Sequence, residues 1–444
     1  MVISVLFMPV THVAFPTIDF IVWDGGDKNS KINRFSLVTS ILFCYFGNDN
    51  SIFPGILEMF IPRFFKPPDG NYFLFGPRGT GKSTFLKQFY PHALWIDLLK
   101  PDVFRKYSAR PERIRELVHG NPQYKTIIVD EVQKVPELLS AVHSLIEEDK
   151  ERKFVLTGSS ARKIKRKNVN LLGGRALLRT MPPFMLAELG HRYSFEQALQ
   201  FGLLPLIYNA TNPKDSLEAY VGLYIREEVQ AEGLVRRIGD FSRFLEAISF
   251  SHGSTLNISN VGRESQIERK TVEGYVSILE DILIGFKLPP FQKKAKRRLS
   301  VHPKFYFFDT GVFQTIRPKG ALDRPEEISG AALEGLVAQH FRAWIAYRSE
   351  KYELYFWRSR NGVEVDFILY GKDGVFAFEI KNTTQIRPQD LLNLREFKKD
   401  YPNAKLVFLY RGNERLFRNG VLCWPVDDFL KNLSINWNPA QELL

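Results

Sequence analysis

The stretch Gly76–Ser83, which reads GPRGTGKS, decides the fold of the chain around it. It fills every fixed position of the P-loop pattern, including the terminal Lys-Ser pair. Glycines allow the backbone N–H groups of such a loop to turn inward around phosphate groups, and the start of the next helix adds partial positive charge. An ordinary Gly-rich turn is the alternative, but such a turn does not require all of these positions to be filled. The stretch therefore predicts a site for a nucleoside triphosphate.

Two side chains of this stretch have predicted roles. We expect Lys82 to reach the β- and γ-phosphates of ATP, and the Ser83 hydroxyl to ligate Mg²⁺. ATP and Mg²⁺ are therefore the predicted cofactors. The other residues expected to contact the nucleotide belong to the loop, to the start of the next helix and to one later strand end: Gly76, Pro77, Arg78, Gly79, Thr80, Gly81, Thr84 and Ser159.

Short apolar runs alternate with longer amphipathic segments around this loop. Each run is too short for a helix and is typical of a strand buried on both faces. Strands that alternate with helices indicate an α/β fold, with a parallel sheet of the P-loop NTPase type covered on both faces. The predicted strands are Tyr72–Phe75, Ala93–Ile96, Thr126–Val129 and Phe154–Leu156, and helices are predicted for Pro111–Val118 and Pro136–Glu148.

Two acidic residues, Asp130 and Glu131, follow the buried run Thr126–Val129. Asp130 fits the Walker B role of holding Mg²⁺ through water, and Glu131 fits the role of orienting or deprotonating the attacking water. A strand that ends in a solvated acidic turn is the alternative when this pair is taken alone. Because a P-loop kinase needs no water-activating acid, Glu131 favours hydrolysis.

The segment after Phe154 supplies further candidates. Thr157 or Ser159 lies where ATPases of the AAA type carry a small polar residue that senses the γ-phosphate, although a strand ending in a Gly-Ser turn explains both residues equally well. Arg175 is a candidate for stabilising the transferred charge, either in its own site or in that of a neighbouring chain. A lone arginine beside a Gly-Gly turn is also typical of a surface residue.

The composition is that of a globular protein of two or three domains, with 444 residues, 44% of them hydrophobic and 25% charged. The two cysteines, Cys44 and Cys423, provide neither a disulfide framework nor a zinc cluster, which favours a reducing, cytoplasmic location. The net charge of +12 is enough to attract a polyanion such as DNA. Every apolar run is interrupted before the roughly 18 residues that a transmembrane helix needs, so no membrane partner is predicted.

We predict four segments. Residues 1–58 show neither a helical nor a strand period and are interpreted as an N-terminal extension of uncertain status. Residues 59–193 are the predicted ATPase domain, and residues 194–310 are predicted to be helical and winged-helix-like. Residues 311–444 return to an alternating pattern and are predicted to form a second α/β domain.

The middle segment contains a pattern, Leu256–Leu283, that resembles a winged helix-turn-helix. A short helix, a turn and a second helix opened by Arg269 and Lys270 would place the second helix where it can enter a major groove. The cationic run Lys293–Arg298 would then lie near the wing and meet phosphates. Winged helices that contact only proteins, and Lys/Arg runs that are only solvated, are the alternatives. DNA and protein are therefore both candidate partners.

Two strand patterns near the C-terminus carry charged residues. The first contains Asp366, and the second ends in Glu379 and Lys381, which together form the core of the PD-(D/E)XK nuclease pattern. A hairpin would bring Asp366 and Glu379 together to hold Mg²⁺, and Lys381 would lie on the same face as Glu379 and position the hydrolytic water. Glu334, on the predicted helix Gly330–Tyr347, fits the extra acid of that fold.

Burying several ionisable side chains in hydrophobic strands is costly unless a metal or an ion pair accepts them. A fold of this type that is retained for structure or binding, without cutting, is therefore the alternative to a nuclease.

Taken together, these segments resemble a family of prokaryotic AAA-type ATPases fused to a C-terminal domain of unknown function. The resemblance covers residues 59 to about 430 and implies the architecture more than a biological role. The stretches that carry it are Phe73–Leu86, Ile127–Val135, Phe154–Arg175, Tyr224–Val229, Lys304–Gly311, Gly330–Phe341, Val363–Leu369 and Phe378–Lys381.

The sequence therefore predicts an ATP-binding and ATP-hydrolysing protein of the AAA type that is associated with DNA and carries a Mg²⁺-dependent nuclease activity. The alternative from another class is a regulatory ATPase switch whose C-terminal domains bind protein or DNA without cleaving it. A P-loop kinase is a third alternative, weakened by Glu131. The oligomeric state, the DNA substrate and the pathway are left open by the sequence.

Overall fold

The computed structural model describes residues 61–160, 172–231, 238–292, 302–320 and 323–443. The proposed N-terminal extension, including Cys44, and the cationic run Lys293–Arg298 lie outside the described residues. Residues Arg63–Leu444 form a single compact unit.

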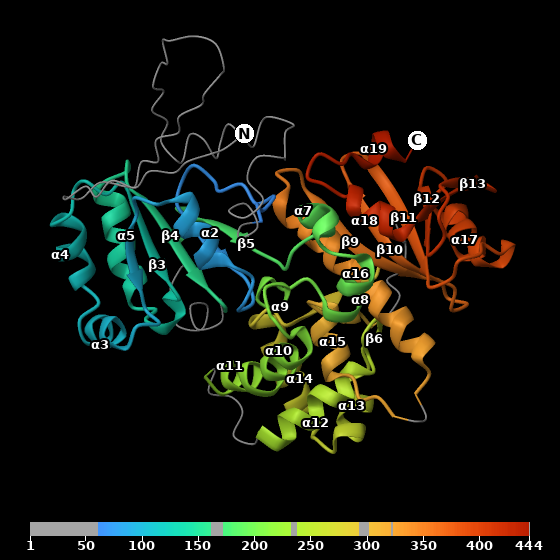
Figure 1. The fold of residues 1–444 in the computed structure, drawn as a ribbon, viewed down its shortest axis with the longest axis horizontal. Helices are drawn as coiled ribbons and strands as arrows, with labels where there is room; N and C mark the ends of the chain where they lie inside the picture. The colour runs from blue at the N-terminus through green and yellow to red at the C-terminus, as the bar shows by residue number, and fades with distance from the viewer. Residues whose placement is uncertain (1–60, 161–171, 232–237, 293–301, 321–322, 444) are drawn as a thin grey trace, which may run out of the picture. The chain divides into compact units, whose positions relative to one another are not determined.

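Five parallel strands form the first sheet, in the order β2-β3-β4-β1-β5 (Figure 1). Strands are apolar and buried where neighbours cover both faces, as the sequence pattern predicts. The predicted α/β fold class is therefore confirmed for this part. Their bounds are β1 Tyr72–Phe75, β2 Leu94–Asp97, β3 Thr126–Asp130, β4 Lys153–Gly158 and β5 Leu177–Thr180. β5 was not predicted from the sequence; it is an edge strand that pairs with β1, and its Leu177 and Leu178 are exposed.

Successive side chains of β1 point to opposite faces of this sheet and enter different cores. Phe73 and Phe75 pack with residues of helices α3, α4 and α5, whereas Tyr72 and Leu74 pack with α2 and with Phe65. Helices therefore cover both faces, as predicted. Their bounds are α2 Lys82–Phe89, α3 Pro101–Ala109, α4 Arg113–His119 and α5 Leu138–Glu148.

The middle of the chain is mainly helical, but it also contains a small antiparallel sheet that the sequence analysis did not predict, in the order β6-β8-β7. Gly285 on β7 allows close packing, since a Cβ there would meet the Phe305 ring at 2.8 Å. The helices are α7 Leu186–Leu189, α8 Phe195–Phe201, α9 Pro205–Tyr208, α10 Pro213–Ala219, the π-helix η5 Tyr220–Ile225, α11 Arg226–Ala231, α12 Ile238–Ser249, α13 Ile258–Ser265, α14 Arg269–Asp281 and α15 Thr310–Ile316, and the strands are β6 Ser254–Thr255, β7 Gly285–Leu288 and β8 Lys304–Phe307.

Helices α13 and α14 occupy the segment whose sequence resembles a helix-turn-helix. The Asn257 side chain caps α13 by accepting a hydrogen bond from the Asn260 backbone N–H at 3.1 Å. Val272, Val276 and Leu279 recur at helical spacing and are buried on one face of α14. The opposite face of the pair remains exposed.

The C-terminal part contains a mixed six-stranded sheet in the order β13-β14-β12-β11-β10-β9 (Figure 1). β9, β10 and β11 are antiparallel neighbours, whereas β11, β12 and β14 run parallel. The second α/β block is therefore confirmed. The elements are α16 Pro325–Tyr347, β9 Tyr352–Arg358, β10 Glu364–Gly371, β11 Gly374–Lys381, α17 Leu392–Asp400, β12 Lys405–Tyr410, β13 Leu416–Arg418, β14 Val421–Pro425, α18 Val426–Asn432 and α19 Pro439–Glu442.

Backbone contacts connect the middle of the chain to this C-terminal sheet. The Phe291 N–H donates to the Phe356 carbonyl at 2.6 Å, and the Phe356 N–H donates to the Pro289 carbonyl at 3.2 Å. The Phe291 side chain is buried in the core beneath β9 and β10. Strands β7 and β8 are thereby held beside the C-terminal sheet. Over the described residues, none of the helices combines the length and the apolar character that crossing a bilayer requires.

Candidate functional site

The loop Gly76–Ser83 connects β1 to α2, at the edge of the sheet where parallel strands end. Gly79 and Gly81 have φ values of +83° and +82°, which side chains rarely adopt. Gly76 is needed for a different reason, because a Cβ there would lie 2.4 Å from the Met181 carbonyl oxygen. The carboxyl edge of parallel strands is where α/β sheets bind ligands. The structure thus places the predicted phosphate loop at the expected edge.

Lys82, at the start of α2, is buried, with 5% of its surface exposed. Its ammonium donates hydrogen bonds to the carbonyl oxygens of Gly76, at 2.6 Å, and Pro77, at 3.1 Å. Burial lowers the pKa of Lys82, whereas the charges of Glu131 and Asp130 raise it. The lysine therefore stays beside neutral carbonyl groups of its own loop, in a position from which it can turn to a phosphate.

Asp130 at the end of β3 is also buried, and two hydroxyl groups donate to it. Ser83 Oγ lies 2.7 Å from Asp130 Oδ2, and Thr157 Oγ1 on β4 donates to Asp130 Oδ1. The predicted pair Ser83 and Asp130 is thus brought together from α2 and β3. Hydroxyl and carboxylate oxygens are the ligands that Mg²⁺ prefers in proteins.

Glu131 follows Asp130 with φ +60°, in the left-handed region that non-glycine residues seldom adopt. Its backbone N–H donates to Thr157 Oγ1 at 3.1 Å, and its carboxylate accepts from the Gln133 amide. Burial raises the pKa of Glu131, and Lys82 opposes that rise. Strained backbone of this kind persists where surrounding structure holds it, often at active sites. Here the Glu131 carboxylate pairs with Gln133 and is close enough to Lys82 for the two charges to interact.

Ser159, the other candidate after β4, is connected to Glu131 through Gln133. The Gln133 amide nitrogen lies 3.0 Å from Ser159 Oγ, and Ser159 Oγ donates to Glu228 at 3.3 Å. Glu228, on α11, is a residue of this site that sequence reasoning missed. Its charge also acts on Lys82. No motif spacing connects α11 to β4, so only the fold reveals this contact.

Aromatic residues of η5 cover the outside of the phosphate loop. Tyr220 donates to the Arg78 carbonyl at 3.1 Å, and the exposed Arg78 guanidinium lies 5.0 Å from the centre of the Tyr224 ring. Leu206 N–H donates to the Gly79 carbonyl at 3.1 Å. Thr84, another predicted contact, is exposed on α2. The loop is therefore held by segments that lie well beyond the P-loop motif in sequence.

Arg175 lies apart from these residues. It precedes β5, and β5 runs parallel to β1, so Arg175 is at the amino edge of the sheet while the phosphate loop is at the carboxyl edge. The amide of Asn71, just before β1, donates to the Arg175 carbonyl at 3.3 Å. The Arg175 guanidinium pairs with exposed Glu147. The structure does not bring Arg175 to the phosphate loop of its own chain.

A buried arginine joins the phosphate loop to α16. Arg63 donates to the Thr80 carbonyl at 3.0 Å and to the Tyr347 hydroxyl at 2.7 Å, and its guanidinium lies 3.2 Å from the carboxylate of Glu188. Two turns earlier on α16, His340 Nε2 accepts from the Leu186 N–H at 3.0 Å. A helix of the C-terminal part is therefore hydrogen-bonded directly to the residues around the loop.

The four predicted C-terminal residues lie on three elements. Asp366 is on β10, Glu379 and Lys381 are on β11, and Glu334 is on α16. The hairpin pairing of Phe367 with Phe378 places Asp366 beside Glu379, as predicted. Burial and, to a lesser extent, the charge of Asp366 raise the pKa of Glu379 to about 8, while Lys381, at 3.1 Å from Glu379, opposes that rise.

A second lysine, which sequence reasoning missed, enters this group from β8. The Lys304 ammonium lies 2.9 Å from Glu334, 2.7 Å from Glu364 and 3.5 Å from Asp366. Tyr306, two residues on, donates to Glu334 at 2.6 Å. The sequence signal is weak, because Lys304 precedes its partners by variable distances and belongs to no spacing pattern.

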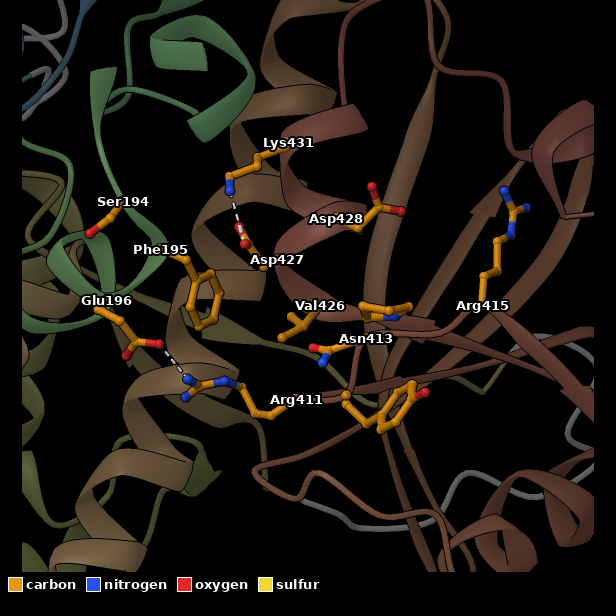
Figure 2. A pocket seen from close by; sticks show the side chains of 13 residues that line it. Ser194, Phe195, Glu196, Arg411, Asn413, Arg415, Val426, Asp427, Asp428 and Lys431 are labelled. Carbon is orange, nitrogen blue, oxygen red and sulfur yellow. Dashed lines mark hydrogen bonds and ion pairs between the residues drawn. The ribbon is translucent and has the colours of Figure 1, made fainter. Parts of the chain in front are cut away.

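A separate cavity of about 670 Å³ lies near the carboxyl ends of β12 and β14 (Figure 2). Within it, Arg411 pairs with Glu196 and Lys431 pairs with Asp427 at 2.9 Å. The Asp428 carboxylate accepts from the Trp424 indole at 2.5 Å. These charged groups of the cavity thus already have partners, and none of the predicted site residues lies there.

Comparisons with known proteins divide the chain into three matched stretches. Residues 69–190 match a family model described as an AAA domain. Residues 192–323 and 329–429 match models described as domains of unknown function, DUF8612 and DUF4143. The match over residues 69–190 supports the resemblance to AAA-type ATPases in that part of the chain.

Two similar proteins are the uncharacterized protein Mb2031c of Mycobacterium bovis and the uncharacterized protein Rv2008c of Mycobacterium tuberculosis. Each is 24% identical over 318 residues, which is 70% of this chain and 70% of the relative. Among solved structures, AMPPCP-bound DnaA from Aquifex aeolicus is 14% identical and covers 48% of this chain and 81% of its own, with a TM-score of 0.23. That score is too low to carry an argument.

Proposed function

We propose that the AAA domain of this chain binds ATP with Mg²⁺ and hydrolyses it. The observation that carries the proposal is the convergence of Lys82, Ser83, Asp130 and Glu131 at one edge of the sheet, with Ser83 Oγ at 2.7 Å from Asp130. A structural role alone gives no reason for a buried lysine, a hydroxyl and two carboxylates to meet behind a glycine-rich loop.

In this proposal each residue has a separate task. The backbone N–H groups of Gly76–Thr80 surround the phosphates, and Lys82 turns from its carbonyl partners to the β- and γ-phosphates. Ser83 and Asp130 would hold Mg²⁺, which supplies charge neutralisation at the phosphates when bound. Glu131 orients the attacking water and accepts its proton, for which a pKa raised by burial is suited.

The Gln133 amide would keep the Glu131 carboxylate in place. Ser159 sits at the other end of the same hydrogen-bonded chain and would report the presence of the γ-phosphate. Glu228 currently accepts from Ser159, so a γ-phosphate would compete with this carboxylate. The segment η5–α11 is therefore the part of the site that we expect to respond first to ATP.

The test is to measure binding of a fluorescent ATP analogue and phosphate release by the full-length protein with Mg²⁺. We expect Lys82→Ala to abolish release and to weaken binding, whereas Lys87→Ala, an exposed lysine on the same helix, should change neither. Equal phosphate release by the two variants would overturn the proposal. Phosphate transfer that requires an added acceptor would instead support a kinase.

We further propose that ATP acts as a switch for the C-terminal part, the regulatory alternative from the sequence. Arg63 supports this, because it holds the Thr80 carbonyl of the loop and the Tyr347 hydroxyl at the end of α16 at the same time. Movement of the loop would therefore displace the end of α16 through Arg63. Hydrogen exchange of α16 should change on addition of a non-hydrolysable ATP analogue, and Arg63→Gln should remove that change.

Cleavage of DNA by the C-terminal domain is the alternative to this switch. The placement of Asp366 beside Glu379, with Lys381 at 3.1 Å from Glu379, favours cleavage, whereas the Lys304 ammonium at 3.5 Å from Asp366 argues against a metal there. Supercoiled plasmid incubated with Mg²⁺ or Mn²⁺, with and without ATP, would test it. Metal-dependent cutting that is lost in Lys381→Ala would establish a nuclease, and absence of cutting with phosphate release retained would leave the switch.

DNA contact by the middle segment is a related proposal. The order α12, β6, α13, α14, β7, β8 is compatible with a winged helix, in which α14 would be the recognition helix. The exposed charges do not favour a polyanion, because three cations are matched by three anions over α13 and α14: Arg263, Arg269 and Lys270 against Glu264, Glu268 and Glu273. A protein partner is the equally supported alternative.

A further inference from the structure

Lys304 lies among the carboxylates Glu334, Glu364 and Asp366 and is almost fully buried, with 1% of its surface exposed. It begins β8, and its ammonium reaches Glu364 at 2.7 Å, Glu334 at 2.9 Å and Asp366 at 3.5 Å. An ammonium has three N–H donors and no acceptor. Lys304 can therefore direct one donor toward each of three carboxylates that come from α16 and β10.

This arrangement keeps Lys304 charged. Burial by itself lowers the pKa of Lys304, but Glu334, Asp366 and Glu364 outweigh burial and raise it well above the usual value. A buried positive charge among carboxylates is stable only when its partners are close and hydrogen-bonded. Tyr306 completes the group by donating to Glu334 at 2.6 Å.

Both carboxylate oxygens of Asp366, the residue that would be shared with a divalent cation, already have partners. Asp366 Oδ1 faces Lys304, and Asp366 Oδ2 accepts from the Ile380 N–H at 2.8 Å. Mg²⁺ requires oxygen ligands at about 2.0–2.1 Å and near-octahedral geometry. A cation bound at Asp366 Oδ1 would share that oxygen with the Lys304 ammonium, and two adjacent positive charges repel.

The remaining carboxylate of this site, that of Glu379, does not provide an alternative set of metal ligands. Glu379 Oε1 accepts from Asn393 at 3.2 Å and pairs with Lys381. Glu379 Oε2 is buried and has no hydrogen-bond partner among the described residues. In the part of the chain that the structure describes, no group of three or more His, Cys, Asp or Glu side chains is arranged to hold a metal ion. As they stand, these residues do not fit Mg²⁺.

We propose that Lys304 is the resident cation of this site and takes the place that a divalent metal would need, so that the C-terminal domain is a metal-free module that does not cut nucleic acid. The carboxylates Glu334, Glu364 and Asp366 then serve to hold β8 against α16 and β10. This role does not require ATP hydrolysis by the AAA domain. The buried, unpartnered Glu379 oxygen marks where a cation would gain a ligand if Lys304 were absent.

The test uses Mn²⁺ alone as the probe, measured by the electron paramagnetic resonance of the free ion. Full-length protein with Asp130→Asn is the background for every variant, because this change removes a ligand of the nucleotide site. With Lys304 present, Asp366→Asn should leave Mn²⁺ binding unchanged. Lys304→Met should bind Mn²⁺ roughly tenfold more tightly or better, because a neighbouring positive charge has been removed. Adding Asp366→Asn should abolish that gain.

A matched control is Lys287→Met, which removes a half-exposed lysine of β7 that pairs with Glu280 at 2.8 Å. It should not create Mn²⁺ affinity. Mn²⁺ binding that depends on Asp366 while Lys304 is present would overturn the proposal, and so would a folded Lys304→Met protein that gains no affinity. If Lys304→Met does not fold, the comparison of the Asp366→Asn variant with its parent still decides, because it needs no change at Lys304.

Discussion

Two lysines, Lys82 and Lys304, are buried near carboxylates, but their pKa values are shifted in opposite directions. Lys82 donates to two neutral carbonyl groups of its own loop, and burial lowers its pKa. Lys304 lies within 3.5 Å of three carboxylates, and their charges raise its pKa well above the usual value. The first lysine keeps its charge available for an incoming anion. The second has its charge already neutralised by the protein.

The difference shows that a buried lysine near acids does not by itself indicate a site. A binding site needs a charge whose compensation comes from the ligand, since only then does the ligand gain free energy on arrival. The glycine-rich loop around Lys82 leaves such room, whereas Glu334, Glu364 and Asp366 fill the corresponding room around Lys304. The contrast has measurable consequences for stability, turnover and pH dependence.

Removing the two lysines should change stability by very different amounts. Lys304→Met leaves buried Asp366 and partly buried Glu334 and Glu364 without their cation, and breaking a buried ion pair in this way costs about 3–5 kcal/mol. Lys82→Met removes a buried charge whose hydrogen bonds go only to carbonyl groups and whose interaction with Glu131 and Asp130 is at longer range, so stability should change little. Thermal melting of the nucleotide-free protein would measure both, at about 2–4 °C for each kcal/mol.

The half-exposed pair Lys287–Glu280 provides the control. Lys287→Met should shift the melting temperature much less than Lys304→Met, because screened ion pairs contribute little. Equal losses for Lys82→Met and Lys304→Met would break the comparison.

Glu131 tests whether the site around Lys82 hydrolyses ATP or only binds it. Glu131→Gln keeps the size of the side chain but removes the group that accepts a proton. We expect phosphate release to fall by at least roughly 10²-fold while ATP binding is retained. Glu151→Gln, in an exposed pair with Lys125, should have no effect. Unchanged turnover in Glu131→Gln would exclude Glu131 as the water-activating residue.

Prediction from sequence succeeded where the residues are contiguous. The stretch Gly76–Ser83 and the pair Asp130–Glu131 each lie within a few positions of a strand end, so period and motif were enough to place them at the carboxyl edge. Strands β1 to β4 were predicted for the same reason, because short buried apolar runs have one common interpretation. The hairpin that pairs Asp366 with Glu379 also follows from local spacing.

The missed residues depend on contacts between distant elements. Lys304 is 30 residues from Glu334 and 62 from Asp366, and Ser159 is 69 residues from Glu228. Such separations are set by how helices and sheets pack, and no local pattern encodes them. Strand β5 was missed because it is a partly polar edge strand whose hydrophobic residues are exposed.

His340 is a third buried ionisable group, and the protein holds it neutral. It lies on α16, as Glu334 does, and burial lowers its pKa to about 4. Its Nε2 accepts from the Leu186 N–H, so protonation there would break that bond. A group with a lowered pKa binds protons more readily when unfolded, so its stabilisation is present above about pH 6.5 and is lost as the pH falls toward 4.

Between pH 6.5 and 5 this histidine should account for about 2 kcal/mol of lost stability. Melting temperatures of wild type and His340→Gln should therefore converge as the pH is lowered, since Gln can still accept from Leu186 N–H but does not titrate. His191→Gln, at an exposed position, should follow the wild-type curve. A His340→Gln protein that loses as much stability as wild type on acidification would show that His340 is not the group responsible.

Arg175 is the opposite extreme, an exposed cation whose partner, Glu147, is also exposed. Because it lies at the amino edge of the sheet, it cannot reach the phosphates of its own chain without a rearrangement of β5. We expect the melting temperature of Arg175→Ala to be indistinguishable from that of wild type, and its turnover in dilute protein to be unchanged. If Arg175→Ala loses turnover only at high protein concentration, and mixing it with Lys82→Ala restores turnover, this arginine acts in a neighbour's site. Each variant then supplies the residue that the other lacks. Loss of turnover at every concentration would contradict the position of Arg175 at the far edge of the sheet.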